Sequence, residues 1–179
     1  AKKGRKTIAK NVAEALRTWH NEFYAEVDFN TTYQTNFSNN CDNRNVVWEQ
    51  MHTITSELAY SGNKSSRTGT GNDFSITWEY PLKVIPDSLK QNIAIELMLN
   101  QKSLNHDAKL IIEAHGSSFN FYRVGFDVKD DIKEVNQWVK YSKTFTIPDS
   151  IKQADLMKIY IYNPSREKIY VDDFRIVIK

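Results

Sequence analysis

The sequence predicts an all-β fold, an antiparallel β-sandwich of the jelly-roll kind, with a short N-terminal helix in front of it. From Val27 onward, short segments alternate apolar and polar residues, and clusters of Gly, Pro, Asn, Asp and Ser separate these segments. Regular short strands divided by turn residues are typical of sandwiches and jelly rolls. A chain of 179 residues accommodates one such domain with an appendage.

Residues 5–24 are the segment with a helical pattern. Apolar side chains recur there at spacings of three and four residues, at Ile8, Val12, Leu16, Trp19 and Phe23. We expect an amphipathic helix that docks on this domain or on a neighbouring one, in preference to a basic helix lying on a membrane. The predicted organisation is a helical extension or linker over residues 1–26 and a β-sandwich domain over residues 27–179.

The sandwich is expected to begin with an irregular stretch at residues 30–45, which is rich in Asn, Thr and Ser. Turn signals such as those at 61–63, 69–72 and 148–149 then divide the chain into strands. The predicted strands are 46–59, 74–84, 92–100, 109–115, 119–128, 137–147, 157–162 and 169–178.

Strand alternation predicts which side chains face the core, because successive residues of a strand point to opposite faces of the sheet. The expected core residues are Ile76, Trp78, Tyr80, Ile93, Ile95, Leu97, Leu99, Leu110, Ile112, Ala114, Val139, Phe145 and Ile147.

The last strand carries a charged residue on its expected inward face. Phe174, Ile176 and Ile178 alternate along this strand, and Asp172 falls on the same face. A carboxylate that faces a core is costly unless it is hydrogen-bonded or bound to a metal. Asp172 is therefore expected to have a specific partner elsewhere in the chain.

Composition excludes several classes of protein. The formal net charge is +2, and the excess of positive charge lies in residues 1–17, so we expect no nucleic-acid surface on the remainder. Cys41 is the single cysteine, which excludes an internal disulfide and a multi-cysteine zinc site. No apolar run approaches the length of a membrane span. No signal peptide is evident, so a secreted protein would correspond to a mature or excised form.

Motifs of hydrolytic and nucleotide-binding enzymes are missing from the sequence. It contains no Gly-x-Ser-x-Gly elbow, no phosphate-binding loop and no His-Glu-x-x-His pair. A glycosidase requires two carboxylates across a cleft. Glu79 and Glu113 could in principle face one cleft, but the sequence does not place them opposite each other. An enzyme is therefore the minority interpretation.

The polar faces of the predicted strands carry aromatic and charged residues together. They are Ser75, Thr77, Glu79, Glu113, His115, Phe119, Tyr122, Arg123, Lys158, Tyr160 and Tyr162. An aromatic ring can cover the C–H face of a sugar while neighbouring charged groups bond its hydroxyls. The alternative is an ordinary solvated sheet whose aromatic residues serve packing.

Residues 27–179 as a whole resemble the carbohydrate-binding modules of the family four/nine group. These are jelly-roll modules attached to xylanases and other hydrolases of plant polysaccharides. The resembling segments, in chain order, are Val27–Asn30, Ser61–Ser65, Phe74–Pro81, Gly116–Phe119, Trp138–Pro148 and Ile169–Phe174.

The resemblance implies a structural calcium ion. The positions that match the family's ligands are Asn30, Ser61, the carbonyl of Lys64, and Asp172. Two acidic residues of the family pattern are replaced by Asn30 and Ser61. Calcium affinity rises with the number of carboxylate ligands, so Asp172 is the best ligand that remains.

The resemblance also implies a cleft in which two rings hold a sugar. The matching positions are Phe74, or its neighbour Asp73, and Phe119, with Thr77, Tyr122, Arg123 and Tyr160 as polar partners. The tryptophan that the family usually places at position 74 is missing. Glu79, Glu113 and His115 complete the set of expected carbohydrate-binding residues.

The expected function is that of a non-catalytic module that holds a larger secreted or cell-surface bacterial glycoside hydrolase on xylan or a related β-glycan. Its expected partners are a polysaccharide and a neighbouring catalytic domain of the same chain, with no nucleic acid or membrane involved. The alternative from another class is a structural or adhesion spacer that has no sugar site. A glycoside-cleaving enzyme is a third and weaker hypothesis.

Overall fold

A computed structural model describes residues 33–43 and 45–179, and residues 34–179 form one compact unit. The predicted helix at 5–24, the boundary between residues 26 and 27, and Asn30 lie outside the described residues. The strands are β1 Asn36–Asn39, β2 Trp48–Glu49, β3 Ile54–Thr55, β4 Ser65–Thr68, β5 Thr77–Tyr80, β6 Asn92–Gln101, β7 Lys109–Gly116, β8 Phe119–Asp127, β9 Val139–Thr146, β10 Leu156–Tyr162 and β11 Ile169–Ile178.

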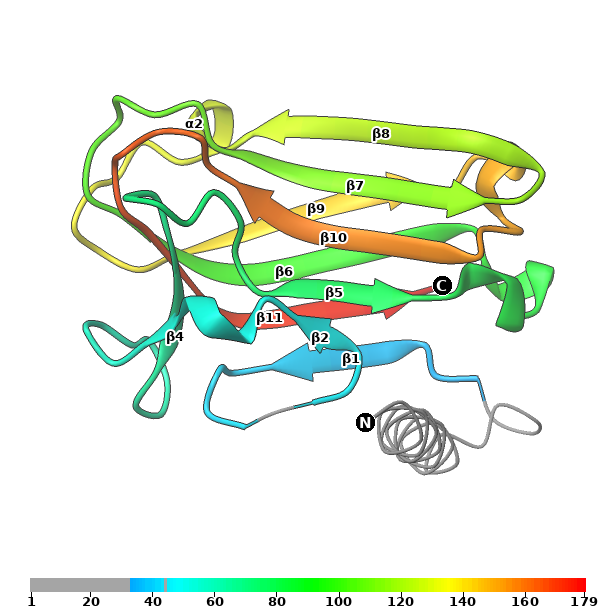
Figure 1. The fold of residues 1–179 in the computed structure, drawn as a ribbon, viewed down its shortest axis with the longest axis horizontal. Helices are drawn as coiled ribbons and strands as arrows, with labels where there is room; N and C mark the ends of the chain where they lie inside the picture. Colours follow the sequence, from blue (N-terminus) through cyan, green and yellow to red (C-terminus); the bar gives the residue numbers. More distant parts are fainter. Residues whose placement is uncertain (1–32, 44) are drawn as a thin grey trace, which may run out of the picture. The chain divides into compact units, whose positions relative to one another are not determined.

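The strands form two antiparallel sheets that pack face to face (Figure 1). The six-stranded sheet has the order β3-β4-β11-β6-β9, with β1 also paired to β11, and the five-stranded sheet has the order β2-β5-β10-β7-β8. This arrangement confirms the predicted antiparallel sandwich.

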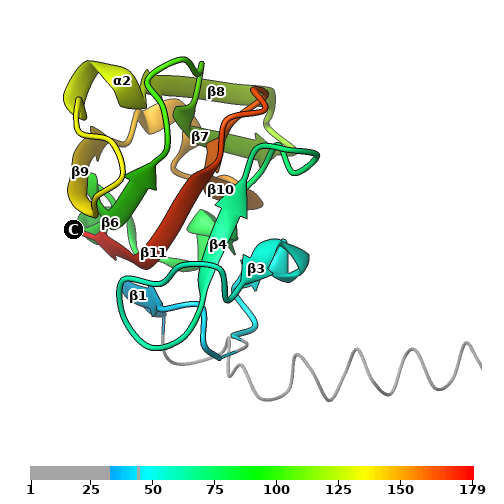
Figure 2. The same cartoon turned by 90° about the vertical axis from the view of Figure 1, so that its left-hand side faces the viewer.

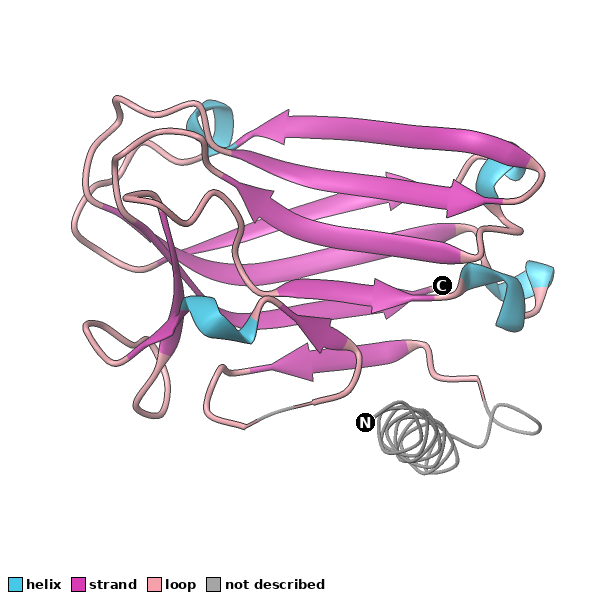
Figure 3. Ribbon diagram, in the orientation of Figure 1, coloured by secondary structure: helices cyan, strands magenta, loops and turns pink. Residues whose placement is uncertain are grey.

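Helical structure among the described residues is limited to short turns (Figure 3). They are α2 Val128–Asp131 and the 3₁₀ turns η1 Met51–Thr53, η2 Leu82–Val84, η3 Asp87–Leu89 and η4 Asp149–Ile151. No described helix has the length and apolar character needed to span a membrane.

The predicted core faces meet between the two sheets. All of the predicted core residues are buried there except Val139, which is partly buried and packs against the same cluster. The short strand β2 adds Trp48, whose ring lies 5.2 Å from that of Phe174. Phe37 of β1 packs between Trp78 and Tyr80, with ring centroids 5.1 and 4.7 Å away.

The structure differs from the prediction in the first half of the chain. Residues 46–59 do not form one strand, because Gln50 has a positive φ of 59° and a 3₁₀ turn separates β2 from β3. The expected strand at 74–84 shortens to β5 and is followed by the turn η2.

Two further strands, β1 and β4, lie where the apolar pattern predicts none. β4 contains no apolar residue, and its buried hydroxyls are satisfied by hydrogen bonds instead. Ser65 Oγ donates to the Leu58 carbonyl at 2.5 Å, and Ser66 Oγ accepts from the Ile76 N–H at 2.8 Å.

Strand β11 is the centre of the six-stranded sheet, as Figure 2 shows with β6 and β4 beside it. One edge pairs with β6 along nearly its whole length. The other edge is divided between two partners, since β4 pairs with 169–171 and β1 with 174–177. A bulge between Asp172 and Arg175, with Asp173 at a φ of 45°, separates the two halves.

The bulge corrects the prediction for Asp172. Because a bulge inserts one extra residue, side chains before and after it switch faces. Val171 and Phe174 face the core, whereas Asp172 lies opposite Met98 on the outer face of the sheet. Asp172 is nevertheless fully buried, at 0% exposure, because the segment 56–64 covers it.

The tight turn at residues 69–72, which follows β4, depends on two glycines. The amide of Gly69 donates to the Asn72 carbonyl at 2.7 Å, and Thr70 and Gly71 both have positive φ values, of 51° and 93°. This geometry matches a two-residue type I′ turn. Gly69 itself has a φ of 80°, and an added Cβ would lie 2.2 Å from the Glu167 carbonyl oxygen.

We predict that Gly69→Ala destabilises the domain far more than Gly71→Ala. The first change combines backbone strain with a clash against backbone and should cost about 3 kcal/mol. The second meets no atom within 4 Å and should cost about 1 kcal/mol for its backbone conformation alone. Urea unfolding of both variants measures the difference, and equal losses would contradict the role of the Glu167 contact.

Candidate functional site

A row of alternating charges crosses the outer face of the five-stranded sheet. Arg123 of β8 is opposite Glu113 of β7, Glu113 is opposite Lys158 of β10, and Lys158 is opposite Glu79 of β5. The Lys158 ammonium lies 2.7 Å from Glu79 Oε1, and Arg123 Nε lies 3.9 Å from Glu113 Oε2. Cross-strand pairs of opposite charge stabilise a sheet locally, and here they leave the row with no net charge.

Aromatic residues border the charged row. Phe74 forms an isolated β-bridge with Tyr162, and its ring lies 5.4 Å from the Tyr162 ring and 5.6 Å from the Tyr160 ring. The Arg123 guanidinium lies 5.6 Å from the centre of the Tyr162 ring. Phe74 remains 40% exposed, so part of its ring stays available to a ligand.

The charged row and the aromatic residues enclose a pocket of about 200 Å³. Its lining residues are Gln50, Phe74, Thr77, Glu79, Glu113, Lys158 and Tyr160. A second pocket of about 160 Å³, which reaches His52 and Asp73, shares Gln50 and Phe74 with the first. The two pockets therefore form one depression on either side of Phe74, which we call the cleft.

Glu113 is the most connected group in the cleft. Tyr160 donates its hydroxyl hydrogen to Glu113 Oε2 at 2.7 Å, and His115 Nε2 lies 3.1 Å from Glu113 Oε1. Burial raises the pKa of Glu113, but the hydrogen bonds from Tyr160 and His115 and the charge of Arg123 outweigh it and hold the pKa below its usual value. Glu113 is therefore an ionised hydrogen-bond acceptor at neutral pH.

The hydrogen bond between Tyr160 and Glu113 also keeps Tyr160 as a donor. Burial, followed by the hydrogen bond to Glu113, raises the pKa of the Tyr160 phenol. The phenol thus stays protonated and fixes the orientation of the Glu113 carboxylate. Oriented groups of this kind can bond sugar hydroxyls without first having to be ordered.

The structure brings most of the predicted carbohydrate-binding residues to one face. Phe74, Thr77, Glu79, Glu113 and Tyr160 line the first pocket. His115 and Arg123 lie at its side, each within 4 Å of Glu113.

Two predicted residues, Phe119 and Tyr122, are not on this face. Tyr122 is opposite Ala114, packs against the core, and has its ring 6.1 Å from that of Phe145. Phe119 packs against the core and leaves no room for a Cβ on Gly116. Phe74 and Phe119 therefore do not form the expected pair of rings around a sugar.

Sequence reasoning missed Gln50 and Phe121. Strand alternation could have identified Phe121, because neighbours such as Tyr122 and Arg123 cannot share a face and Phe121 lies on the side of Arg123. Its ring is 52% exposed and lies 5.1 Å from His115. Gln50 gave no signal, since its position depends on the break between β2 and β3.

The residues expected to hold calcium are only partly together. Asp172 Oδ2 accepts hydrogen bonds from the amides of Tyr60 at 2.8 Å and Ser61 at 3.1 Å, and Oδ1 accepts from the amide of Asp173 at 2.8 Å. Burial raises the pKa of Asp172, while these three amides oppose the rise. N–H donors suit an anion and do not bind a cation.

The described residues around Asp172 therefore fit calcium poorly. The hydroxyl of Ser61 donates to Asp173 Oδ1 at 2.5 Å, so that oxygen is also engaged. No group of three or more His, Cys, Asp or Glu side chains that could hold a metal occurs within residues 33–43 and 45–179. Asn30 lies outside the described residues, and a structural calcium stays a proposal that a measurement with the ion must test.

We predict that Asp172→Ala lowers the free energy of unfolding by about 3 kcal/mol, because it leaves three partly buried N–H groups without their acceptor. Thermal melts should show this loss, whereas Asp149→Ala, at a side chain that is 94% exposed, should change little. A chelator should leave both melts unchanged if the amides alone satisfy Asp172. A melting temperature that falls with chelator, and only when Asp172 is present, would instead establish the calcium ion.

No protein-family model and no curated protein matches this chain. Solved structures do match. The first family 22 module of Xyn10C from Paenibacillus barcinonensis, a xylan-binding domain, has a TM-score of 0.56 at 16% identity, covering 79% of this chain and 92% of that chain. The C-terminal family 22 carbohydrate-binding module of Clostridium thermocellum Xyn10B has a TM-score of 0.54 at 14% identity, with the same coverages of 79% and 92%.

A further structure, described as the xylan-binding domain of family 22, has a TM-score of 0.53 at 12% identity and covers 83% of this chain and 96% of that chain. These modules belong to family 22, and the resemblance to the four/nine group rests on the sequence segments alone. The three likenesses show that this chain has the β-sandwich fold of carbohydrate-binding modules.

Proposed function

We propose that this chain is a non-catalytic carbohydrate-binding module that recognises xylan or a related β-glycan of the plant cell wall in the cleft. One observation carries the proposal. The exposed Phe74 ring is held against Tyr160 and Tyr162 beside the paired groups Glu113 and Lys158.

The cleft offers an apolar aromatic face and polar side chains, which match the apolar C–H face and the hydroxyl groups of a sugar. The Phe74 ring offers an apolar face to the axial C–H groups of a pyranose. Glu113 accepts hydrogen bonds and Lys158 donates them, and Thr77 Oγ1, whose hydrogen is donated to the Ser75 carbonyl, can accept. Since Glu113 and Lys158 are already held by Tyr160 and Glu79, little side-chain entropy is lost when a sugar binds.

The shape of the cleft supports an extended ligand. Each pocket is smaller than the roughly 300–1,000 Å³ of an enclosed small-molecule site, and the two adjoin at Phe74. A linear polysaccharide can lie across both pockets with one ring over Phe74. The xylan-binding domains with a similar fold support xylan as the first ligand to test.

The charge state of Glu113 supports a binding role over a catalytic one. A glycosidase needs a carboxylic acid whose pKa is raised so that it can protonate the leaving group. The pKa of Glu113 is instead lowered, and Glu79 is engaged by Lys158. These carboxylates suit recognition of hydroxyl groups.

The biological role that follows is to keep a glycoside hydrolase close to its polymer. We infer that a catalytic domain is joined to this module in the full protein, and that the protein acts outside the bacterial cell or at its surface, where plant polysaccharide is found. The assignment to the four/nine group of modules is part of this proposal and rests on the resembling segments.

We predict that the chain is retarded in affinity electrophoresis through soluble xylan and that Phe74→Ala weakens this retardation about tenfold, because stacking on the ring is lost. Tyr60→Ala is the matched control, since it removes another half-exposed ring outside the cleft. Gels with β-glucan and mannan test selectivity. Unretarded migration of the native chain in all three polymers would favour a structural or adhesion spacer instead.

Glu113 should make stability depend on pH. Its folded pKa is lowered, so the ionised form favours the folded state, and this stabilisation is present above about pH 4.3, the ordinary value for Glu. It is lost as the pH falls through the folded pKa. In thermal melts, Glu113→Gln should therefore be less stable than the native chain at about pH 6, and the gap should close towards about pH 3.

Glu96→Gln is the control for this experiment. Glu96 lies on the six-stranded sheet, and its hydrogen bond from Lys140 lowers its pKa in a similar way. Both variants should lose pH-dependent stability, but only Glu113→Gln should reduce retardation in xylan. If Glu113→Gln and Glu96→Gln are retarded equally in xylan, Glu113 is not part of the binding site.

A further inference from the structure

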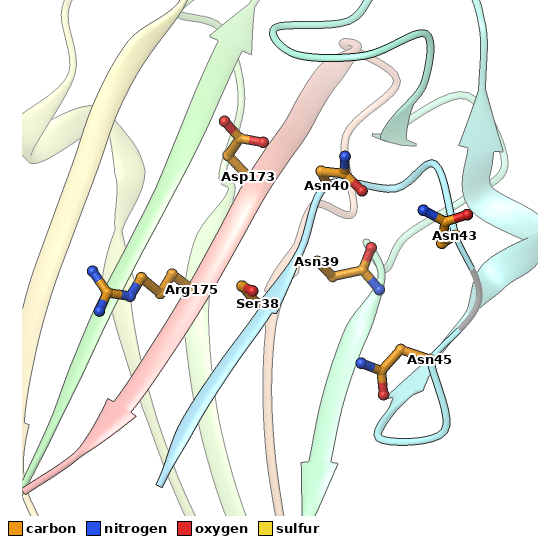
Figure 4. A pocket seen from close by; sticks show the side chains of 7 residues that line it. All are labelled: Ser38, Asn39, Asn40, Asn43, Asn45, Asp173 and Arg175. Atoms are coloured by element: carbon orange, nitrogen blue, oxygen red, sulfur yellow. The ribbon is translucent and has the colours of Figure 1, made fainter.

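A larger pocket, of about 490 Å³, lies at a different place, where the chain passes from β1 of the six-stranded sheet towards β2 of the five-stranded one (Figure 4). Four of its seven lining residues are asparagines, and none of the seven belongs to the cleft. We call it the asparagine pocket. The proposed function makes no use of it.

Asn39 shows that the pocket has an unsatisfied donor. Its side chain is 6% exposed and extends from β1 towards the segment that carries Asn43 and Asn45 (Figure 4). Its Oδ1 accepts the amide hydrogen of Cys41 at 2.7 Å, which settles the orientation of the side-chain amide. The Nδ2 group has no hydrogen-bond partner among the described residues.

An unsatisfied buried N–H is costly, and native proteins contain few of them. A water molecule, or a ligand oxygen that displaced it, would remove this cost by accepting a hydrogen bond from Asn39 Nδ2. The donor is thus aimed at an acceptor that the described chain does not supply.

The charges at the far side of the pocket are balanced. Asp173 and Arg175 both line it, from the bulge in β11. Ser61 occupies one oxygen of Asp173, and Arg175 Nε donates to Asn36 Oδ1 at 3.4 Å. Among the described lining residues, one carboxylate and one guanidinium cancel, so these residues favour neither a free anion nor a cation over a neutral molecule.

A metal ion is the poorest candidate. The group that lacks a partner is an N–H donor, and Arg175 adds a positive charge. Cations need oxygen ligands that point inward. Neutral hydroxyl groups, in contrast, can accept from Asn39 Nδ2 and donate to the carbonyl oxygen of a neighbouring asparagine.

We propose that the asparagine pocket is a second glycan site, separate from the cleft, which takes one neutral sugar ring through hydrogen bonds to its hydroxyls. None of the described lining residues is aromatic, so we expect binding there to lack stacking and to be weaker than in the cleft. A module with two sites on different parts of its surface can hold two chains, or two stretches of one chain, and gains avidity without a tighter single site.

The experiment is a nuclear magnetic resonance titration of the full chain labelled with ¹⁵N. Xylotetraose, cellotetraose and mannotetraose are added in turn to Phe74→Ala, in which the cleft is disabled. At least one sugar should shift the Asn39 side-chain NH₂ resonances in a saturable way, with a dissociation constant of about 1 mM. No shift with any of the three sugars overturns the proposal.

Two variants test where the sugar binds. Asn39→Asp keeps the acceptor for Cys41 but removes the donor, and Ser38→Tyr fills the mouth of the pocket from an exposed position of β1. In the Phe74→Ala background each should weaken binding about tenfold, and Ser38→Tyr covers the case in which Asn39→Asp does not fold. Unchanged affinity in a folded Ser38→Tyr chain overturns the proposal.

The same variants distinguish failure of the proposed cleft from failure of the proposed asparagine pocket. In the chain with Phe74 intact, Ser38→Tyr should leave retardation in xylan and shifts of the Lys158 and Tyr160 amides as they are. Loss of these cleft signals together with the Asn39 signals would mean that there is one site and not two. A titration with calcium chloride that shifts Asn39 and blocks the sugar would show a cation site, and would also overturn the proposal.

Discussion

The fully buried carboxylate of Asp172 is the interaction on which the six-stranded sheet depends. It accepts hydrogen bonds from the amides of Tyr60 and Ser61 on the outer face of β11, and these bonds hold the segment 56–64 over that face. The same segment is tied at its start, where Glu57 accepts the Tyr170 hydroxyl hydrogen at 2.8 Å. Within this cover the Tyr60 ring packs 5.9 Å from Trp138. The carboxylate thus joins the last strand to a long loop, and through the Tyr60 ring this loop reaches Trp138, the residue that precedes β9.

The two proposed binding regions arise from different departures from regular strand structure. The cleft exists because the chain breaks at Gln50, between β2 and β3, and because Phe74 joins the sheet only through a single bridge to Tyr162. The asparagine pocket exists because β11 bulges at Asp173, which turns that side chain towards β1. Regular strands supply the rigid background, and the irregular positions supply the exposed groups.

Much of the fold could be predicted from the sequence, because the alternation of apolar residues along a long strand identifies the side that faces the core. The strands from β6 to β11 agree with prediction to within about two residues. β1 and β4 could not be predicted, since the partner strand β11 and buried hydroxyl hydrogen bonds hold them, and neither leaves an apolar pattern. Asp172 was placed on the wrong face because the bulge inserts an extra residue, and no Gly or Pro in the sequence marks its position.

The candidate site was predicted in part for the same reason. Glu79, Glu113 and Tyr160 come from regular strands, and alternation places them correctly. Phe119 and Tyr122 were assigned to the sugar face from the predicted strand at 119–128 and again from the family resemblance, but the pairing of β8 with β7 turns both towards the core.

The divided edge of β11 has a consequence for how the chain associates with itself. Among the described residues, the four of β1 pair with the backbone of 174–177, which includes Phe174 and Ile176 next to the core. A chain cut after Asn39 would present this stretch as an open strand edge flanked by apolar side chains. Such edges recruit another strand by main-chain hydrogen bonding, so a second molecule could donate its own β1 and exchange strands. Besides forming part of the sheet, β1 therefore protects this edge from pairing with strands of other molecules in fibres or strand-exchanged assemblies.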